Sequence, residues 1–178
     1  HDWLAAHDRQ LADVDVLAVV IGPGSFTGLR VGIAAIQGLA VASARPVVGV
    51  PTLDALAEAW LMVPAFPDAI VVACLDGQRG EVFLAAWDAF GAGSVERAVP
   101  IVPPSITRPE SVAEVLATVP SDRRIVLVGD ATERHAEILK RALPDAYLTG
   151  APVPLAEAAA WLASRRPETA GAPHALRP

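Results

Sequence analysis

The sequence predicts an α/β fold in which helices cover a mixed β-sheet. Short apolar runs of strand length recur along the chain, some alternating with polar residues and some continuous, and helical patterns separate several of them. One of these runs passes through a glycine-rich turn directly into a long helix of small residues. The chain has 178 residues, of which 53% are hydrophobic, so it can bury the core of one full domain or of two small lobes.

The expected elements follow one another along the chain. Residues 3–12 are expected to form the tail of a longer helix. Strands are expected near residues 14–21, 46–50, 70–76, 81–88 and 125–129. Helices are expected near residues 27–43, 52–62, 109–118, 132–143 and 154–165.

A proline-rich span, Pro100 to Pro109, is the best candidate for a boundary inside the chain. Thr107, followed three residues later by Glu110, fits a capping box at the start of the helix beyond it. We therefore expect a core lobe with the interface helices over residues 1–99 and a C-terminal α/β part over residues 100–178.

The glycine-rich turn between residues 22 and 28 is expected to be tight, with a restricted backbone conformation. Gly22 and Gly24 can take backbone angles that a Cβ would forbid, and Thr27 can cap the helix that follows. No lysine follows Gly28, so the turn is not a P-loop, and its glycines are spaced one residue too far apart for a dinucleotide fingerprint. Ser25 lacks the flanking glycines of a nucleophile elbow. Two uses remain, a phosphate cradle or a close packing contact.

The helix expected over 27–43 carries small residues on one face and almost no polar stripe. A glycine inside a helix costs about 1 kcal/mol relative to alanine, so Gly32 and Gly38 indicate the close approach of another backbone. Helix 52–62 is also nearly all apolar, and the pair fits either a subunit interface or an internal core. The residues expected at such an interface are Gly28, Arg30, Gly32, Ala35, Ile36, Leu39, Leu56 and Trp60.

One dense charged group lies beside the turn expected at residues 77–80, which separates two β-rich runs and predicts a hairpin. Asp76 and Arg79 could hold this turn as an ion pair, or the group could contact a ligand together with Glu81. The candidate ligand-proximal residues of the chain are therefore Gly22, Gly24, Ser25, Thr27, Asp76, Arg79 and Glu81.

The inventory of catalytic and metal-ligating residues is nearly empty. The four histidines form no i, i+4 pair, and the single cysteine, Cys74, fits a small core residue better than a nucleophile. We expect no catalytic residue, no metal and no cofactor. The net charge of −6 also argues against tRNA binding by this chain alone. The uninterrupted apolar runs are shorter than the roughly 18 residues of a membrane helix, which favours a cytoplasmic protein.

Several motifs resemble the TsaB (YeaZ) family. They are the run from Gly22 to Gly32, the segment Gln37-Gly38-Leu39-Ala40, and the segment from Val48 to Leu53. Leu75 to Phe83 looks like the family's D-x-R-x-G-E-V-Y segment, with Phe83 in the aromatic place. The motifs cover most of residues 11 to 90. Beyond about residue 95 the resemblance rests on the pattern of elements and on the closing segment from Pro173 to Pro178.

The resemblance implies an actin-like ASKHA (ribonuclease H-like) fold, here apparently without the N-terminal strands that open the fold in the family. It also implies a dimerisation subunit that is not itself the transferase. Its partners would be a catalytic TsaD-type subunit and an ATPase TsaE-type subunit. The complex would place threonylcarbamoyl on N6 of the adenosine 3′ of the anticodon, and tRNA would be bound only through the complex. A homodimer through helices 27–43 and 52–62 is the other arrangement. The alternative function is an independent nucleotide hydrolase or peptidase-like enzyme of the actin-like superfamily.

Overall fold

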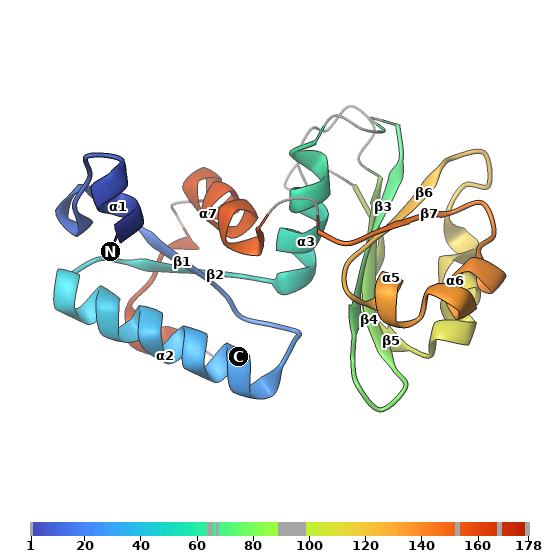
Figure 1. The fold of residues 1–178 in the computed structure, drawn as a ribbon, viewed down its shortest axis with the longest axis horizontal. Helices are drawn as coiled ribbons and strands as arrows, with labels where there is room; N and C mark the ends of the chain where they lie inside the picture. Colours follow the sequence, from blue (N-terminus) through green and yellow to red (C-terminus); the bar gives the residue numbers. More distant parts are fainter. Residues whose placement is uncertain are drawn as a thin grey trace. The chain divides into compact units, whose positions relative to one another are not determined.

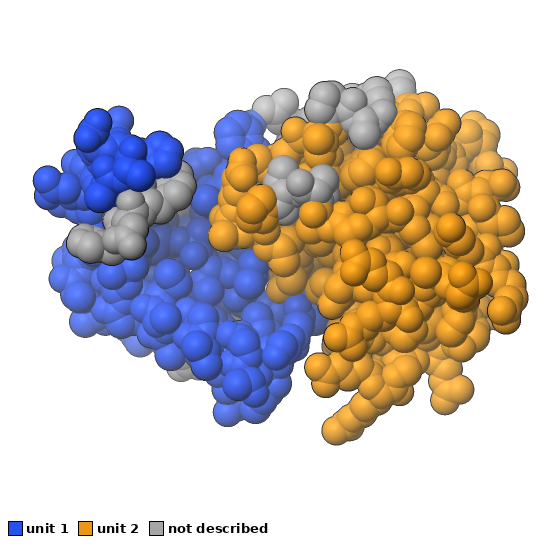
Figure 2. Space-filling view, in the orientation of Figure 1, with its two compact units in different colours: residues 1–51, 159–178 blue, residues 52–158 orange. Residues whose placement is uncertain are grey.

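A computed structural model describes residues 2–63, 66, 68–88, 99–151, 154–166 and 169–176. The chain forms two compact units, one of residues 1–51 with 159–178 and one of residues 52–158 (Figure 2). The expected boundary between residues 99 and 100 is wrong, because it falls inside a strand of the second unit's sheet. The expected α/β class with a mixed sheet flanked by helices is confirmed.

The first unit is built on a two-stranded parallel sheet and one long helix. Its elements are α1 (Asp2–Ala6), the 3₁₀ turn η1 (Leu11–Asp13), β1 (Leu17–Val20), α2 (Phe26–Ser43), β2 (Val47–Val50) and the 3₁₀ turn η5 (Pro173–Ala175). β1 pairs with β2 in the register Leu17↔Val47 to Val20↔Val50. The helix α2 connects the two strands and lies along them (Figure 1). The expected helical tail over 3–12 is instead a short helix followed by a separate 3₁₀ turn.

The second unit contains a five-stranded mixed sheet in the order β5-β4-β3-β6-β7 (Figure 1). The strands are β3 (Ile70–Asp76), β4 (Val82–Asp88), β5 (Val99–Thr107), β6 (Ile125–Val128) and β7 (Tyr147–Thr149). β3, β4 and β5 are antiparallel neighbours, whereas β6 pairs parallel with β3 and with β7. Parallel strands such as β6 and β7 are normally covered on both faces of their sheet.

Helices cover both faces of the five-stranded sheet. They are α3 (Thr52–Leu61), η2 (Pro109–Ser111), α4 (Val112–Val115), η3 (Leu116–Thr118), α5 (Ala131–Arg134) and α6 (Ala136–Ala142). A further helix, α7 (Leu155–Arg165), follows β7, and its residues 159–165 belong to the first unit. Alternate residues of β3 point to opposite faces, so Val71 packs with α3 while Val72 packs with α4 and α6. The strand is buried on both sides, as its continuous apolar run predicts.

Several elements differ from the sequence-based expectation. β5 and β7 are not predicted by the pattern, because β5 contains three prolines and β7 has only three residues. β5 is an edge strand, where proline is tolerated since one row of amides has no neighbour to pair with. Thr107 ends β5 and does not cap a helix, and the expected helix 109–118 consists of three short turns.

Candidate functional site

The outer face of α2 is apolar and exposed. Of its 18 residues only Ile33 and Ala40 are buried, and the helix packs on β1 and β2 with this side. Val31 is 65% exposed and Val41 is 73% exposed on the other side. We define the α2 apolar face as Phe26, Gly28, Val31, Ala34, Ala35, Gly38, Leu39, Val41 and Ala42, all of which are exposed. An exposed apolar surface of this kind is typical of an interaction site.

Most of the interface residues expected on α2 are accessible. Gly28, Ala35 and Leu39 belong to the α2 apolar face, whereas Gly32 and Ile36 are half-buried at its border. A Cβ added at Gly32 or at Gly38 would meet no atom within 4 Å. Packing within the first unit therefore does not require glycine at either position. The Arg30 guanidinium lies over the Phe26 ring, with Cζ 3.9 Å from the ring centre.

The two interface residues expected on α3 are in the core of the second unit. Leu56 is 1% exposed and Trp60 is 5% exposed, and both belong to the hydrophobic cluster between α3 and the sheet. The interpretation of α3 as part of an exposed interface surface is therefore wrong. The apolar surface of α3 is covered because β3 and β6 present a continuous apolar face to it, which periodicity within α3 alone does not show.

The glycine-rich turn caps α2. Ser25 is the N-cap, and its hydroxyl accepts a hydrogen bond from the Gly28 amide at 3.3 Å. Thr27 is already inside the helix, so its expected capping role is wrong. Gly22 has a φ of 115°, where glycine is favoured, and a Cβ there would lie 3.3 Å from Leu29. The Gly22-Pro23 peptide bond is cis. The turn thus packs on the Leu29 side chain in the first turn of α2.

The expected hairpin at residues 77–80 is confirmed, but Asp76 does not pair with Arg79. Gln78 and Arg79 both have φ above 50°, and the Gly77 amide donates to the Glu81 carbonyl at 2.8 Å. Arg79 and Glu81 are exposed in the turn. The Asp76 side chain is only 8% exposed and turns toward residues that follow β6.

Three polar residues surround Asp76 in a cluster. Its carboxylate lies 3.0 Å from His135 Nε2 and 3.1 Å from Arg134 Nη1, and its own amide donates to the Asp130 carboxylate at 2.9 Å. β3 and β6 are parallel, so Asp76 at the end of β3 and Asp130 just after β6 meet at the same sheet edge. Asp130, Arg134 and His135 were not expected from the sequence. The polar residues after the strand at 125–129 were the signal that could have found them.

Two features support the cluster from inside the sheet. Gly129 has a φ of 135°, and a Cβ there would lie 2.2 Å from the Cys74 carbonyl oxygen. The Thr132 hydroxyl lies within hydrogen-bond distance of the carbonyls of Gly129 and Thr149.

Burial, with a smaller effect of the nearby Asp130 charge, raises the pKa of Cys74 to about 12, so this thiol is a protonated core residue.

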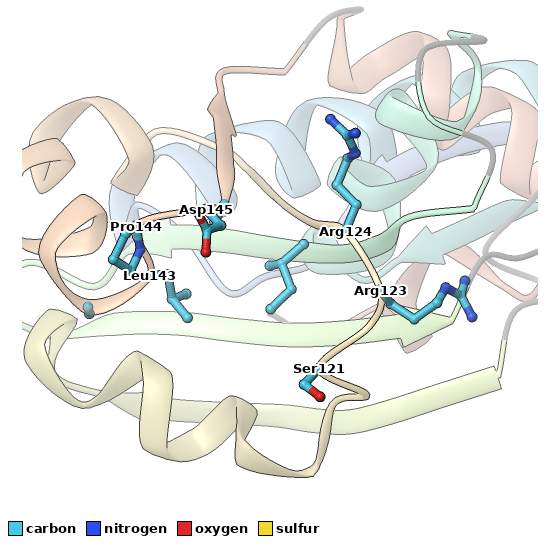
Figure 3. Close-up of a pocket in the computed structure, with 9 residues that line it drawn as sticks. Ser121, Arg123, Arg124, Leu143, Pro144 and Asp145 are labelled. Atoms are coloured by element: carbon cyan, nitrogen blue, oxygen red, sulfur yellow. The ribbon is translucent and has the colours of Figure 1, made fainter.

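A cavity of about 220 Å³ lies in the second unit between the loop before β6 and the loop before β7 (Figure 3). Its polar rim includes Ser121, Arg123, Arg124 and Asp145. Arg123 binds the Asp88 carboxylate at 2.9 Å, and Arg124 lies 4.3 Å from the centre of the Phe66 ring. Figure 3 shows both guanidinium groups pointing away from Pro144 and Asp145. The two arginines of the cavity therefore serve contacts within the fold.

Within the described residues no group of three or more His, Cys, Asp or Glu side chains could hold a metal ion. α2 is the one described helix whose length and mean hydropathy, 18 residues and 1.4, would be enough to cross a membrane. The uninterrupted apolar runs in its sequence are shorter, because Arg30 and Gln37 interrupt them. The same composition is found in helices that pack against protein.

Comparison with known proteins gives consistent matches. A family model described as "TsaD: tRNA N6-adenosine threonylcarbamoyltransferase" matches residues 1–146. The chain is 41% identical over 87 residues to the "tRNA threonylcarbamoyladenosine biosynthesis protein TsaB" of Escherichia coli (strain K12), covering 48% of this chain and 36% of that protein. The protein of the same name from Bacillus subtilis (strain 168) is 26% identical over 143 residues, covering 80% of this chain and 58% of that protein.

The fold also matches solved structures. The structure described as "YeaZ from Pseudomonas aeruginosa" has a TM-score of 0.72 at 25% identity, and the match covers 99% of this chain and 79% of the other. By contrast, the matches to the curated TsaB proteins of Escherichia coli and Haemophilus influenzae cover only 36% and 33% of those proteins' lengths.

Proposed function

The chain belongs to the TsaB (YeaZ) group of the TsaD family, and from this premise we propose that it is a non-catalytic dimerisation subunit in threonylcarbamoyladenosine synthesis on tRNA. In this role it binds a catalytic TsaD-type subunit and supports N6-threonylcarbamoylation of the adenosine 3′ of the anticodon. The observation that carries the proposal is the α2 apolar face, nine exposed small or apolar residues, beside which Arg30, the charged residue of α2, lies over the Phe26 ring.

The small residues of this face suit a helix of the partner. Helices pack at interaxial distances of 8–10 Å, and small side chains allow the closer end of that range. Gly28, Ala35 and Ala42 are all exposed and small, and the neighbouring Leu39 is 37% exposed and can fill a groove on the partner. Gly32 and Gly38 have free space beside them, so a partner backbone can approach there. Burying such a face would remove its apolar area from water at about 25 cal/mol per Å².

The remaining parts of the proposal follow from the same premise. The protein is cytoplasmic, an ATPase TsaE-type subunit completes the complex, and tRNA is bound through the assembly. A homodimer through α2 is the alternative assembly. In neither does this chain bind ATP tightly on its own, and Gly22, Gly24, Ser25 and Thr27 would act mainly in packing.

Association with the catalytic subunit tests the proposal. The protein and the TsaD-type subunit of the same organism would be purified separately and mixed in sedimentation velocity experiments. Ala35→Arg places a charge on the α2 apolar face and should abolish the complex. The matched control is Ala160→Arg, because Ala160 is an exposed helical alanine on α7. The control should leave the complex intact.

Three results would count against the proposal. They are equal complexes with both variants, no complex with the wild-type protein, and robust ATP or peptide hydrolysis by the isolated protein that Asp76→Ala abolishes. The last result would favour the independent enzyme. Calorimetric titration of ATP into the isolated protein adds a direct check, since submicromolar affinity would give the glycine-rich turn a phosphate-binding role.

A further inference from the structure

The segment from Thr169 to Leu176 adds a third chain segment to the sheet of the first unit. The Gly171 amide donates to the Val47 carbonyl at 2.9 Å, and the Val47 amide donates back to the Gly171 carbonyl at 3.1 Å. This reciprocal pair is an antiparallel bridge to β2. Val47 is 2% exposed, so the bridge covers a buried part of the strand.

The same segment also contacts α2. The Gln37 side-chain amide donates to the Pro173 carbonyl at 2.8 Å, a part-buried hydrogen bond between residues 136 positions apart. Gln37 is half-buried on the side of α2 that carries Ile33 and Ala40. At the far end of the segment, a Cβ added at Gly49 would lie 3.0 Å from the Leu176 side chain. The segment is therefore tied to both the helix and the strand beneath it (Figure 1).

α2 packs on β1 and β2 through the side that carries Ile33 and Ala40. Gln37 adds a hydrogen bond from this side of α2 to residues 169–176, and the Gly171 bridge fixes those residues on β2. The Gln37 hydrogen bond and the Gly171 bridge therefore connect α2 to β2 through a segment that is distant in the chain.

We propose that residues 169–176 act as a strap that holds α2 in its partner-binding position, so that release of the strap weakens association through the α2 apolar face. The link to association rests on the proposed function, whereas the link between the strap and α2 does not. A ligand's apparent affinity falls in proportion to the fraction of protein that is binding-competent.

Hydrogen exchange measures the strap without any partner. Gly171→Pro removes the amide that donates to Val47, and Gly171→Ala keeps it. The alanine Cβ has room, because no atom lies within 4 Å of a Cβ at this position, whereas the proline Cδ takes the place of the amide hydrogen that points at the Val47 carbonyl. Loss of one net hydrogen bond corresponds to about fivefold, so we expect at least about fivefold faster exchange in α2 for the proline variant and wild-type exchange for the alanine variant.

A second pair of variants acts from the helix side. Gln37→Met removes the donor to Pro173 at similar size, whereas Ser43→Ala removes a hydrogen bond to Leu39 within α2 itself. Gln37→Met should speed exchange in residues 169–176 and lower affinity for the catalytic subunit severalfold, and Ser43→Ala should leave exchange of the strap unchanged. The proposal that the strap holds α2 would be wrong if α2 exchanged at the wild-type rate in Gly171→Pro and the strap exchanged at the wild-type rate in Gln37→Met. If both exchange results hold but the wild-type protein binds no catalytic subunit, the proposed function fails and the strap stands.

Discussion

The Asp76 carboxylate and the His135 imidazole lie 3.0 Å apart at one edge of the five-stranded sheet, although 59 positions separate them in the chain. Arg134 contacts the other carboxylate oxygen at 3.1 Å, and Asp130 accepts a hydrogen bond from the Asp76 amide. The nearly buried Asp76 carboxylate thus joins the β3–β4 hairpin to the end of α5 and the start of α6.

Asp76→Ala should destabilise the second unit by about 1–3 kcal/mol, because it removes the carboxylate partner of the mostly buried His135 imidazole. The exposed Arg134 contributes little to this figure, since its charge remains solvated. Urea unfolding followed by tryptophan fluorescence measures the change. Glu81→Ala, in the exposed turn nearby, is the control and should change stability by less than about 0.5 kcal/mol.

Cys74 should resist alkylation in the folded protein. Burial raises its pKa from 9.0 to about 12, so the thiolate fraction at pH 8 is negligible and the sulfur is covered. Iodoacetamide at pH 8 should label the protein only after denaturant is added, as mass spectrometry would show. Rapid labelling of the native protein would contradict the burial of this strand.

The same pKa change makes stability depend on alkaline pH. The folded protein keeps the proton up to about pH 12, whereas the unfolded thiol loses it near pH 9. The Cys74 contribution to stability is therefore fully present below pH 9 and is lost as the pH rises toward 12. Cys74→Ala should unfold with a smaller pH dependence over this window, measured by thermal melts.

Glycine substitutions should have opposite effects at two positions. Gly129→Ala places a Cβ 2.2 Å from the Cys74 carbonyl oxygen at a φ of 135°, so we expect a loss of about 2 kcal/mol or more. Gly38→Ala enters open space on a regular helix and should raise stability by up to about 1 kcal/mol. The two melting temperatures, measured side by side, should move in opposite directions.

Gly32→Arg should leave the protein folded and abolish its association with the catalytic subunit. A Cβ at residue 32 meets nothing within 4 Å, so a long side chain can leave toward solvent without disturbing β1 or β2. Circular dichroism checks the fold, and sedimentation with the partner checks the association. A folded variant that sediments with the partner like the wild-type protein would rule out this part of α2 as the contact.

Local patterns in the sequence determined the elements whose residues interact with near neighbours. The hairpin at residues 77–80 followed from its glycines between two β-rich runs, and α2 followed from its small residues after a glycine-rich turn. The buried strands β3, β4 and β6 were recognisable as continuous apolar runs. In each case the information lies within about ten residues of the element itself.

Only the tertiary structure decided what each apolar surface faces. The helices α2 and α3 have similar compositions, yet α3 is buried against β3 and β6 while α2 keeps most of its surface exposed. The sequence pattern did not predict the partners of Asp76 either. Parallel pairing of β3 with β6 brings His135 and Asp130 to Asp76 from more than fifty positions away in the chain. Periodicity reports which residues share a face, and the pairing of distant strands decides what covers that face.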